Sequence, residues 1–366
     1  MKIPELTPRM MRDWLLEEDS ARLEQLWYMA NFVRERKVGQ DVFLRGLIEF
    51  SNRCARNCTY CGLRAANGDI ARYSLSERDM IGCVGVALEL GIGTLVMQSG
   101  EGVALETEQL LRFFRFVGHE KKMALTLSVG ELSDVEFLAF REAGVNRYLL
   151  RFETSNKALY NHIHPAKKNC VEGNQKNGNH TDSDRIRMLR KLRELNFEVG
   201  SGVMVGIPGQ TVDDLVNDLL LFRELDLDMV GIGPYMPHPE TPLALEFEDH
   251  KSSYVCSNRE LLTYKMIALT RIILPDANIP STTALATLNR EHGRVLGLQR
   301  GANILMPNIT PQKYRSEYSI YPEKAGTSMG PDDSYAAAVS AIAQAGRTVG
   351  AGKGDSLRYL ARKGNH

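Results

Sequence analysis

Short apolar stretches alternate with amphipathic stretches of helical period along most of this chain. Eight strand–helix pairs can be followed, and their predicted strands are 42–50, 94–98, 124–129, 147–151, 198–205, 229–233, 278–282 and 303–306. Repeated units of this kind favour a parallel sheet with helices outside it, and eight of them favour a closed barrel. No G-x-G-x-x-G motif opens a predicted helix, so a dinucleotide-binding sheet has no support. The sequence therefore predicts an α/β fold, a complete (β/α)8 TIM barrel.

The segments outside these units predict additions to the barrel. Residues 5–38 carry apolar side chains at helical spacing, so we expect an N-terminal helical cap over 1–41, the barrel over 42–310 and a C-terminal extension over 311–366. Within the extension we expect a helix over about 332–345 followed by a mobile end. A Lys-, Asn- and Gly-rich stretch without periodicity predicts an exposed, mobile insertion at about 164–181.

Three cysteines, Cys54, Cys58 and Cys61, follow the first predicted strand at the spacing C-x3-C-x2-C. A tight loop of this spacing can aim three thiolates at one point, and thiolates are soft ligands for zinc, copper(I) or iron–sulfur clusters. A structural zinc site needs a fourth protein ligand, and no second Cys or His pair of suitable spacing is present. On a [4Fe-4S] cluster, three cysteine ligands would leave one iron open to a small molecule.

Composition narrows the setting of this chemistry. Lys+Arg and Asp+Glu balance at 45 each, which gives no attraction to nucleic acid or to a membrane surface. No apolar run approaches the length that spans a bilayer, and the N-terminal residues lack the apolar core of a signal peptide. The other cysteines, Cys83, Cys170 and Cys256, are too scattered for a disulfide framework. We therefore expect a cytoplasmic, monomeric protein in a reducing compartment, as an oxygen-sensitive cluster would require.

Polar and methionine side chains gather where the predicted strands end. Along the chain they are Gln98, Ser99, Gly100, Glu101, Thr126, Ser128, Arg147, Arg151, Glu153, Met204, Met229, Thr282, Thr283 and Met306. Taken singly, Gln98 could cap a strand, and Arg151 and Glu153 could form a structural ion pair. The carboxyl ends of the strands carry the chemistry of a (β/α)8 barrel, so a whole ring predicts a deep cavity for an anionic or zwitterionic ligand. An arginine buried there would need a partner such as a carboxylate.

The cysteine motif, with Tyr60 directly before its last cysteine, resembles that of radical S-adenosylmethionine (SAM) enzymes. Seven further runs, in order, resemble the HydE family of [FeFe]-hydrogenase maturases: 98–101, 147–151, 204–211, 229–234, 237–239, 274–280 and 301–308. The resemblance covers about residues 10–325. It implies a barrel of the radical SAM type, one [4Fe-4S] cluster, and reductive cleavage of SAM to a 5′-deoxyadenosyl radical during assembly of the hydrogenase H-cluster. The implied substrate is an iron–cysteine species carrying CO and cyanide, whose sulfur the radical attacks.

The same resemblance implies roles for single residues. Cys54, Cys58 and Cys61 would ligate the cluster. The implied SAM-binding residues are Tyr60, Ser99, Gly100, Glu101, Ser128, Glu153, Arg185 and Met204. The implied substrate-binding residues are Gln98, Thr126, Arg147, Arg151, Met229, Thr282, Thr283, Met306 and Tyr321. No catalytic side chain is implied beyond the cluster and SAM. The expected partners are an electron donor such as ferredoxin or flavodoxin and the other hydrogenase maturases.

The chain departs from this family pattern at two places. Residues 325–343 contain no cysteine where some family members carry a second cluster, so we expect a single cluster. The segment between His162 and Arg185 is long, and its His162, His164, Cys170 and His180 could form an adventitious metal site, although a loop is the expected structure. Alternative interpretations are an enzyme similar to methylornithine synthase or biotin synthase, a non-catalytic iron–sulfur carrier, and a structural zinc protein.

Overall fold

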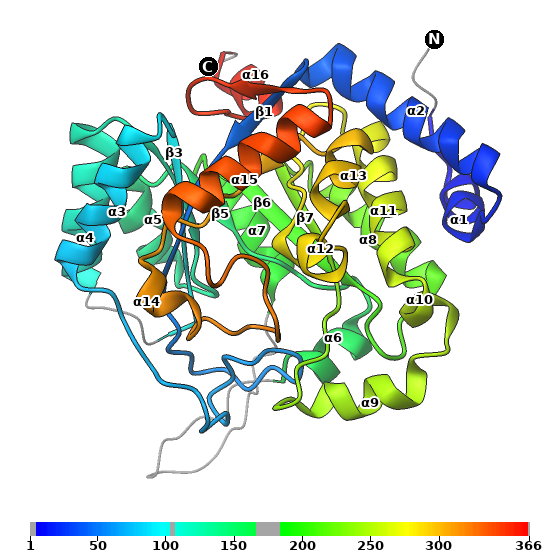
Figure 1. Ribbon diagram of the computed structural model, residues 1–366, viewed down its shortest axis with the longest axis horizontal. Helices are drawn as coiled ribbons and strands as arrows, with labels where there is room; N and C mark the ends of the chain where they lie inside the picture. The colour runs from blue at the N-terminus through cyan, green and yellow to red at the C-terminus, as the bar shows by residue number, and fades with distance from the viewer. Residues whose placement is uncertain (1–4, 103–106, 166–183, 365–366) are drawn as a thin grey trace.

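The computed structural model describes residues 5–102, 107–165 and 184–364. Six parallel strands lie side by side in chain order (Figure 1): β2 (Gly46–Ser51), β3 (Thr94–Ser99), β4 (Ala124–Ser128), β5 (Arg147–Leu149), β6 (Glu198–Val205) and β7 (Met229–Pro234). The connecting helices are α3 (Glu77–Glu89), α4 (Thr107–Arg115) with a π-helical turn (Phe116–Glu120), α5 (Asp134–Glu142), α6 (Lys157–Ile163), α7 (Arg185–Glu194) and α8 (Val212–Glu224). The predicted α/β fold with a parallel sheet is confirmed.

Hydroxyl side chains set where several of these helices begin. Ser76 caps α3, Ser133 caps α5 and Thr211 caps α8, each by accepting a hydrogen bond from the backbone N–H three residues later. Ser133 and Thr211 form reciprocal capping boxes with Glu136 and Asp214. These local signals determine where the three helices begin.

Beyond β7 the chain continues as single parallel bridges rather than full strands. Met229 and Ile232 of β7 bridge to Asn278 and Ser281, Pro280 bridges to Ile304, and Leu47 of β2 bridges to Asn308. The seventh predicted strand, 278–282, is therefore present only as bridges, and the eighth is the two-residue β8 (Ile304–Leu305). The helices of this part are α9 (Pro242–His250), α10 (Tyr254–Ser257), α11 (Arg259–Ile273), α12 (Thr283–Leu288), α13 (Gly293–Gln299) and α14 (Gln312–Arg315).

The two ends of the chain are joined in a second small sheet. The predicted strand 42–50 is two strands, β1 (Asp41–Leu44) and β2, because β1 pairs instead with β8 and with β9 (Thr348–Gly350). The prediction of a mobile end after residue 345 is wrong: β9 and α16 (Leu357–Gly364) follow α15 (Pro331–Gln344). The N-terminal helical segment is α1 (Pro8–Leu16) and α2 (Ser20–Val38), which lie at the outside in Figure 1.

Side chains of the six-stranded sheet alternate between two faces. One face carries Leu95, Leu125 and Val203, which belong to the same hydrophobic core as Val84 of α3 and Phe137 of α5. The residues between them point away from these helices, toward what we call the inner face. Its positions include Glu49, Gln98, Thr126, Arg147, Arg151 and Met204. Among the described residues, the structure contains no helix that is both long and apolar enough to cross a membrane.

Candidate active site

The cysteine loop leaves the sheet where β2 ends and is held by buried polar contacts. The amide of Asn52 donates to the carbonyl oxygens of Ala71 and Glu317, both at 2.7 Å. The guanidinium of Arg72 donates to the carbonyl oxygens of Asn52, Leu63, Arg64 and Asn67 at 2.7–3.1 Å. Figure 1 shows this blue loop near α6 and α9, at the end of the sheet opposite β1 and α16. The cysteines therefore lie at the carboxyl ends of the strands.

Gly100 allows β3 to approach the cysteine loop closely. A β-carbon at this position would lie 2.2 Å from the carbonyl oxygen of Arg53 and 2.6 Å from the β-carbon of Cys54, so only glycine fits. The close approach aims two backbone N–H groups at Cys54 Sγ, that of Glu101 at 3.3 Å and that of Arg56 at 3.4 Å. Such N–H groups stabilise a thiolate, which is the form that binds iron.

The chemistry of the three thiols fits a cationic iron–sulfur cluster. Burial, together with the charge of Cys54, raises the pKa of Cys61 to about 12. Burial also raises the pKa of Cys58 far above its ordinary value, with Cys61 and Cys54 contributing. Three thiols close enough to oppose one another's ionisation need a bound cation to become thiolates together. Among the described residues, the other cysteines, Cys83 and Cys256, are buried elsewhere as free thiols.

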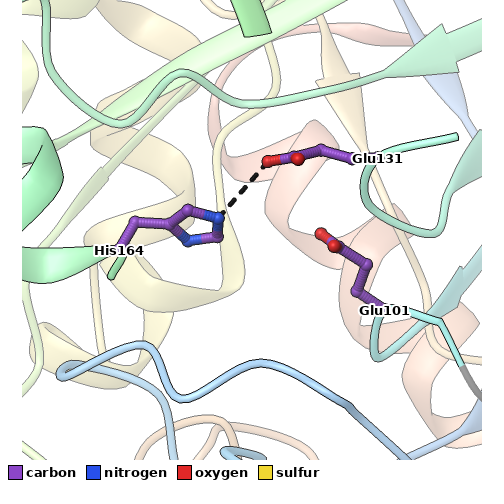
Figure 2. A group of neighbouring side chains, drawn as sticks. All are labelled: Glu101, Glu131 and His164. Carbon is purple, nitrogen blue, oxygen red and sulfur yellow. Dashed lines mark ion pairs between the residues drawn. The ribbon is translucent and has the colours of Figure 1, made fainter. Parts of the chain in front are cut away.

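A compact charged group lies beside the cysteine loop. Arg56 Nε contacts Glu101 Oε1 at 2.5 Å, and its Nη2 pairs with Glu131. Arg185 Nε contacts Glu131 Oε1 at 3.0 Å, and its Nη2 lies 3.7 Å from Glu101 Oε2. His164 Nε2 is 3.4 Å from Glu131 Oε1, and Figure 2 shows its ring facing both carboxylates. Burial lowers the pKa of His164, and Arg185 lowers it further.

The spacing within this group would also suit a metal ion. One ligand atom from each of Glu101, Glu131 and His164 lies within 4.8 Å of the others. However, both carboxylates already face the guanidinium groups of Arg56 and Arg185, and a cation would have to displace them. The charges of two arginines and two glutamates balance without a metal. The group therefore fits a site that holds a zwitterion, such as the amino acid end of SAM, next to the cysteines.

Glu153 lies beyond β5 in a backbone conformation that is rare for its residue type. Its φ is +63°, in the left-handed region that disfavours residues with a β-carbon. Its backbone is held by β6, since its N–H donates to Gly202 and its carbonyl accepts from Met204 N–H, both at 3.0 Å. The next turn is fixed by Asp218, whose carboxylate accepts from Ser155 N–H at 2.6 Å. The fold thus stores strain to aim the Glu153 carboxylate.

A second, smaller hydrophobic core packs against Tyr60 of the cysteine loop. It consists of Leu159, Ile163, Met204, Ile207, Tyr235, Leu243, Phe247 and Cys256, with Tyr60 packed against it. Burial raises the pKa of Tyr60 well above its ordinary value, and Glu153 and Cys58 add to the shift. Thus Tyr60, Met204 and Glu153, three of the predicted SAM-binding residues, lie together beside the cysteines. Ser99, whose hydroxyl donates to the Gly100 carbonyl, and Ser128 end the neighbouring strands β3 and β4.

The predicted substrate-binding residues fall into several places. Gln98, Thr126 and Arg151 lie on the inner face of neighbouring strands. Tyr321 is close to Arg151, since burial and the charge of Glu49 raise the pKa of Tyr321 while Arg151 lowers it. The hydroxyl of Thr282 is used in the fold: it caps α12 and contacts the Ile232 carbonyl at 3.3 Å. Thr283 and Met306 line a small cavity with Arg294 and Ala338.

Arg147 and Met229 make structural contacts that the sequence did not predict, although Arg147 pairs in register with the candidate Thr126. They are the first residues of β5 and β7, so they lie at the amino ends of the strands, away from the cysteine loop. Arg147 pairs with Glu198 at 2.7 Å and with Asp355 at 2.6 Å, and Met229 Sδ contacts Arg45 at 2.9 Å. The sequence showed that both residues lie at the end of an apolar strand, but not whether this was the amino or the carboxyl end.

The family resemblance gave no role to several polar residues of this site. Arg56 and Glu131 hold the charged group, and Glu49 forms a buried pair with Lys324 at 2.6 Å. Glu49 stands alone as a charge within an apolar strand, which is a usable signal, whereas nothing local marks Lys324. Two residues of the suggested adventitious metal site have different partners, since His162 pairs with Glu246 and His164 faces Cys58. These two side chains therefore do not point at a common metal position. Cys170 and His180 lie outside the described residues.

Comparison with known proteins identifies the family of the chain. Residues 48–222 match the model of the radical SAM superfamily. The [FeFe] hydrogenase maturase subunit HydE of Thermotoga maritima is 42% identical over 87% of this chain and 85% of its own length. The 3-methylornithine synthase of Methanosarcina acetivorans is 27% identical over 84% of this chain and 80% of its own length.

The fold has a close match among solved structures. The crystal structure of a methylornithine synthase aligns with a TM-score of 0.76 and 21% identity over 99% of this chain and 97% of that one. At this identity the match speaks for the radical SAM fold alone. The identity to HydE, at nearly full length, carries the family assignment. The chain is a radical SAM enzyme and belongs to the HydE family of [FeFe]-hydrogenase maturases.

Proposed function

We propose that this enzyme acts in H-cluster assembly on a small cysteine-bound iron complex, Fe(CO)2(CN), on the way to the diiron subcluster. Cys54, Cys58 and Cys61 would hold one [4Fe-4S] cluster, which supplies when bound the electron that splits SAM into methionine and a 5′-deoxyadenosyl radical. The substrate sulfur is the atom this radical would attack. The family implies both cofactors.

The residues around the cysteines have distinct tasks in this proposal. Arg185 would bind the SAM carboxylate, Glu101 its amino group and Glu153 its ribose hydroxyls, since each offers the complementary charge or acceptor. Tyr60, Met204, Ser99, Gly100 and Ser128 would complete the SAM pocket. Arg151, Gln98 and Tyr321 would bind the anionic iron complex, whose cyanide and carboxylate groups accept hydrogen bonds. Burial of Glu101, Glu153 and Arg185 would keep water away from the radical.

One observation carries the substrate proposal. Thr126 lies on the inner face with none of its surface exposed, and its hydroxyl has no hydrogen-bond partner within the described part of the chain. A buried hydroxyl without a partner costs about 1–3 kcal/mol, and on the inner face a bound ligand would supply the missing partner. Gln98 lies one layer nearer the carboxyl ends, since Gln98 pairs in register with Ser128. In this proposal the iron complex would lie against these positions of the inner face.

Replacing this hydroxyl tests the proposal. Thr126→Val should lower kcat/KM for the iron complex about tenfold, because one hydrogen bond of about 1.4 kcal/mol is lost. SAM cleavage without substrate should be unchanged. Thr270→Val is a matched control, since Thr270 is equally buried with an unpartnered hydroxyl, but lies on α11. Equal effects of the two substitutions on kcat/KM would contradict the role of Thr126.

We also infer that the sheet closes into a complete (β/α)8 barrel. The parallel bridges from β7 to 278–281, from there to β8, and from Asn308 to β2 support closure. In this arrangement residues 42–310 form the barrel between an N-terminal cap and a C-terminal extension. An electron donor of the ferredoxin or flavodoxin type and the other maturases complete the proposed pathway as partners.

A further inference from the structure

His164 joins two parts of the site that the family resemblance treats separately. It caps the carboxyl end of α6, and only 3% of its surface is exposed. Its Nδ1 lies 3.0 Å from Cys58 Sγ. Its Nε2 lies 3.1 Å from Arg185 Nη2 and 3.4 Å from Glu131 Oε1. A single buried ring thus touches a cysteine of the metal-binding motif and the arginine beside it.

The donors around the ring fix which nitrogen carries its proton. An arginine nitrogen can only donate a hydrogen bond, so the contact with Arg185 requires a lone pair on His164 Nε2. A neutral imidazole with a lone pair on Nε2 carries its proton on Nδ1. That proton points at Cys58 Sγ. Glu131 Oε1 lies farther from the same nitrogen, at 3.4 Å against 3.1 Å for Arg185 Nη2, so we assign the ring proton to Nδ1 from the shorter contact.

We propose that His164 is a positioning residue that donates its Nδ1–H to the sulfur of Cys58 and thereby raises the reduction potential of the bound cluster. The proposal rests on the cluster that the family implies, and not on the identity of the maturase substrate. A hydrogen bond to a ligand sulfur stabilises the reduced cluster, which carries one more negative charge. Arg185 holds the ring in the tautomer that makes this bond.

Three variants measure this contribution. His164→Ala removes the donor, whereas His164→Asn places an amide N–H close to the position of Nδ1. His162→Ala is the matched control, because His162 is two residues away, half exposed, and pairs with Glu246 at 2.8 Å. Each protein is reconstituted without oxygen, and its cluster is titrated by EPR-monitored reduction in the absence of SAM and substrate.

In His164→Ala the ratio of reduced to oxidised cluster at a fixed potential should fall about tenfold, which for a one-electron couple is a midpoint lower by about 59 mV. His164→Asn should restore most of this shift, and His162→Ala should not differ from the wild type. Equal midpoints for the wild type, His164→Ala and His164→Asn at full cluster content would overturn the proposal. So would an Asn variant whose midpoint is as low as that of the Ala variant.

If the variants fail to hold the cluster, a measurement on the wild-type protein tests the same hydrogen bond. With 15N-labelled histidine, pulsed EPR of the reduced cluster should detect one weakly coupled 15N nucleus, and His162→Ala should keep this signal. A reduced cluster without any 15N coupling would refute the hydrogen bond. Neither measurement contains substrate, so failure here leaves the proposed maturase function untouched.

Discussion

Cys58→Ala is expected to abolish SAM cleavage and the broad visible absorbance of an iron–sulfur cluster. The buried sulfur of Cys58 lies beside His164 and near the other two thiols, and no remaining side chain of the loop can replace it as a soft ligand. With two ligands left, the cluster should not assemble. 5′-Deoxyadenosine is quantified after anaerobic reconstitution and reduction, together with iron and sulfide per chain. Cys54→Ala and Cys61→Ala should behave alike.

Cys83→Ala is the matched control for the cysteine variants. Cys83 is also a buried free thiol, but it lies on α3 in the main hydrophobic core. Its replacement should keep the absorbance and SAM cleavage, with only a small loss of stability from the missing sulfur. If Cys58→Ala retained SAM cleavage near the level of Cys83→Ala, the assignment of the cysteine loop would be wrong.

Arg147→Met is expected to lower the stability of the fold. Arg151→Met, four residues further along the chain, is expected to lower substrate turnover instead. Arg147 is fully buried and pairs with Glu198, which is fully buried as well. Its loss leaves a buried carboxylate whose other arginine, Arg45, is 3.9 Å away, and should destabilise the fold by about 3–5 kcal/mol. A lower midpoint of urea unfolding measures this. SAM cleavage per folded, cluster-loaded molecule should change little.

Arg151→Met serves as the counterpart. The Arg151 side chain is 28% exposed and pairs with Glu153 at 3.0 Å, so its loss should cost less stability than the loss of the fully buried Arg147. Substrate-dependent turnover should fall about 10- to 100-fold, as expected for loss of a charge-assisted hydrogen bond, while SAM cleavage without substrate persists. A stable Arg147→Met protein with a specific defect in substrate binding would reverse our division of the two arginines.

The parts of the fold set by local patterns could be predicted from the sequence. The strand 198–205 was predicted with its observed bounds, because its apolar pattern and the nearby turns determine them. The pairing of strands that are far apart in the chain left no comparable pattern in the local sequence. The break at Arg45 depends on β1 joining β8 and β9, which lie about 260 and 305 residues further along the chain. The same pairing orders the C-terminal segment that composition suggested was mobile.

The candidate site shows the same limit. The cysteine spacing located the loop, and Glu101, Glu153 and Arg185 lie around it as the resemblance implied. The sequence could not show that Arg147 marks the amino end of its strand, since one short apolar run carries polar residues at both ends. Nor could it show that His164 is buried against Cys58, because the surrounding composition resembles a loop. Tertiary contacts alone give these side chains their roles.

The most direct test of the maturase function measures SAM consumption by the reduced, cluster-loaded protein with and without cysteine-bound iron dicarbonyl cyanide. We expect 5′-deoxyadenosyl transfer to depend on the iron complex and to yield a product with a carbon–sulfur bond to the adenosyl group. Lysine, offered in place of the complex, should not be consumed. Slow SAM cleavage that is indifferent to the iron complex, or turnover of lysine, would contradict the function proposed here and leave only the radical SAM chemistry.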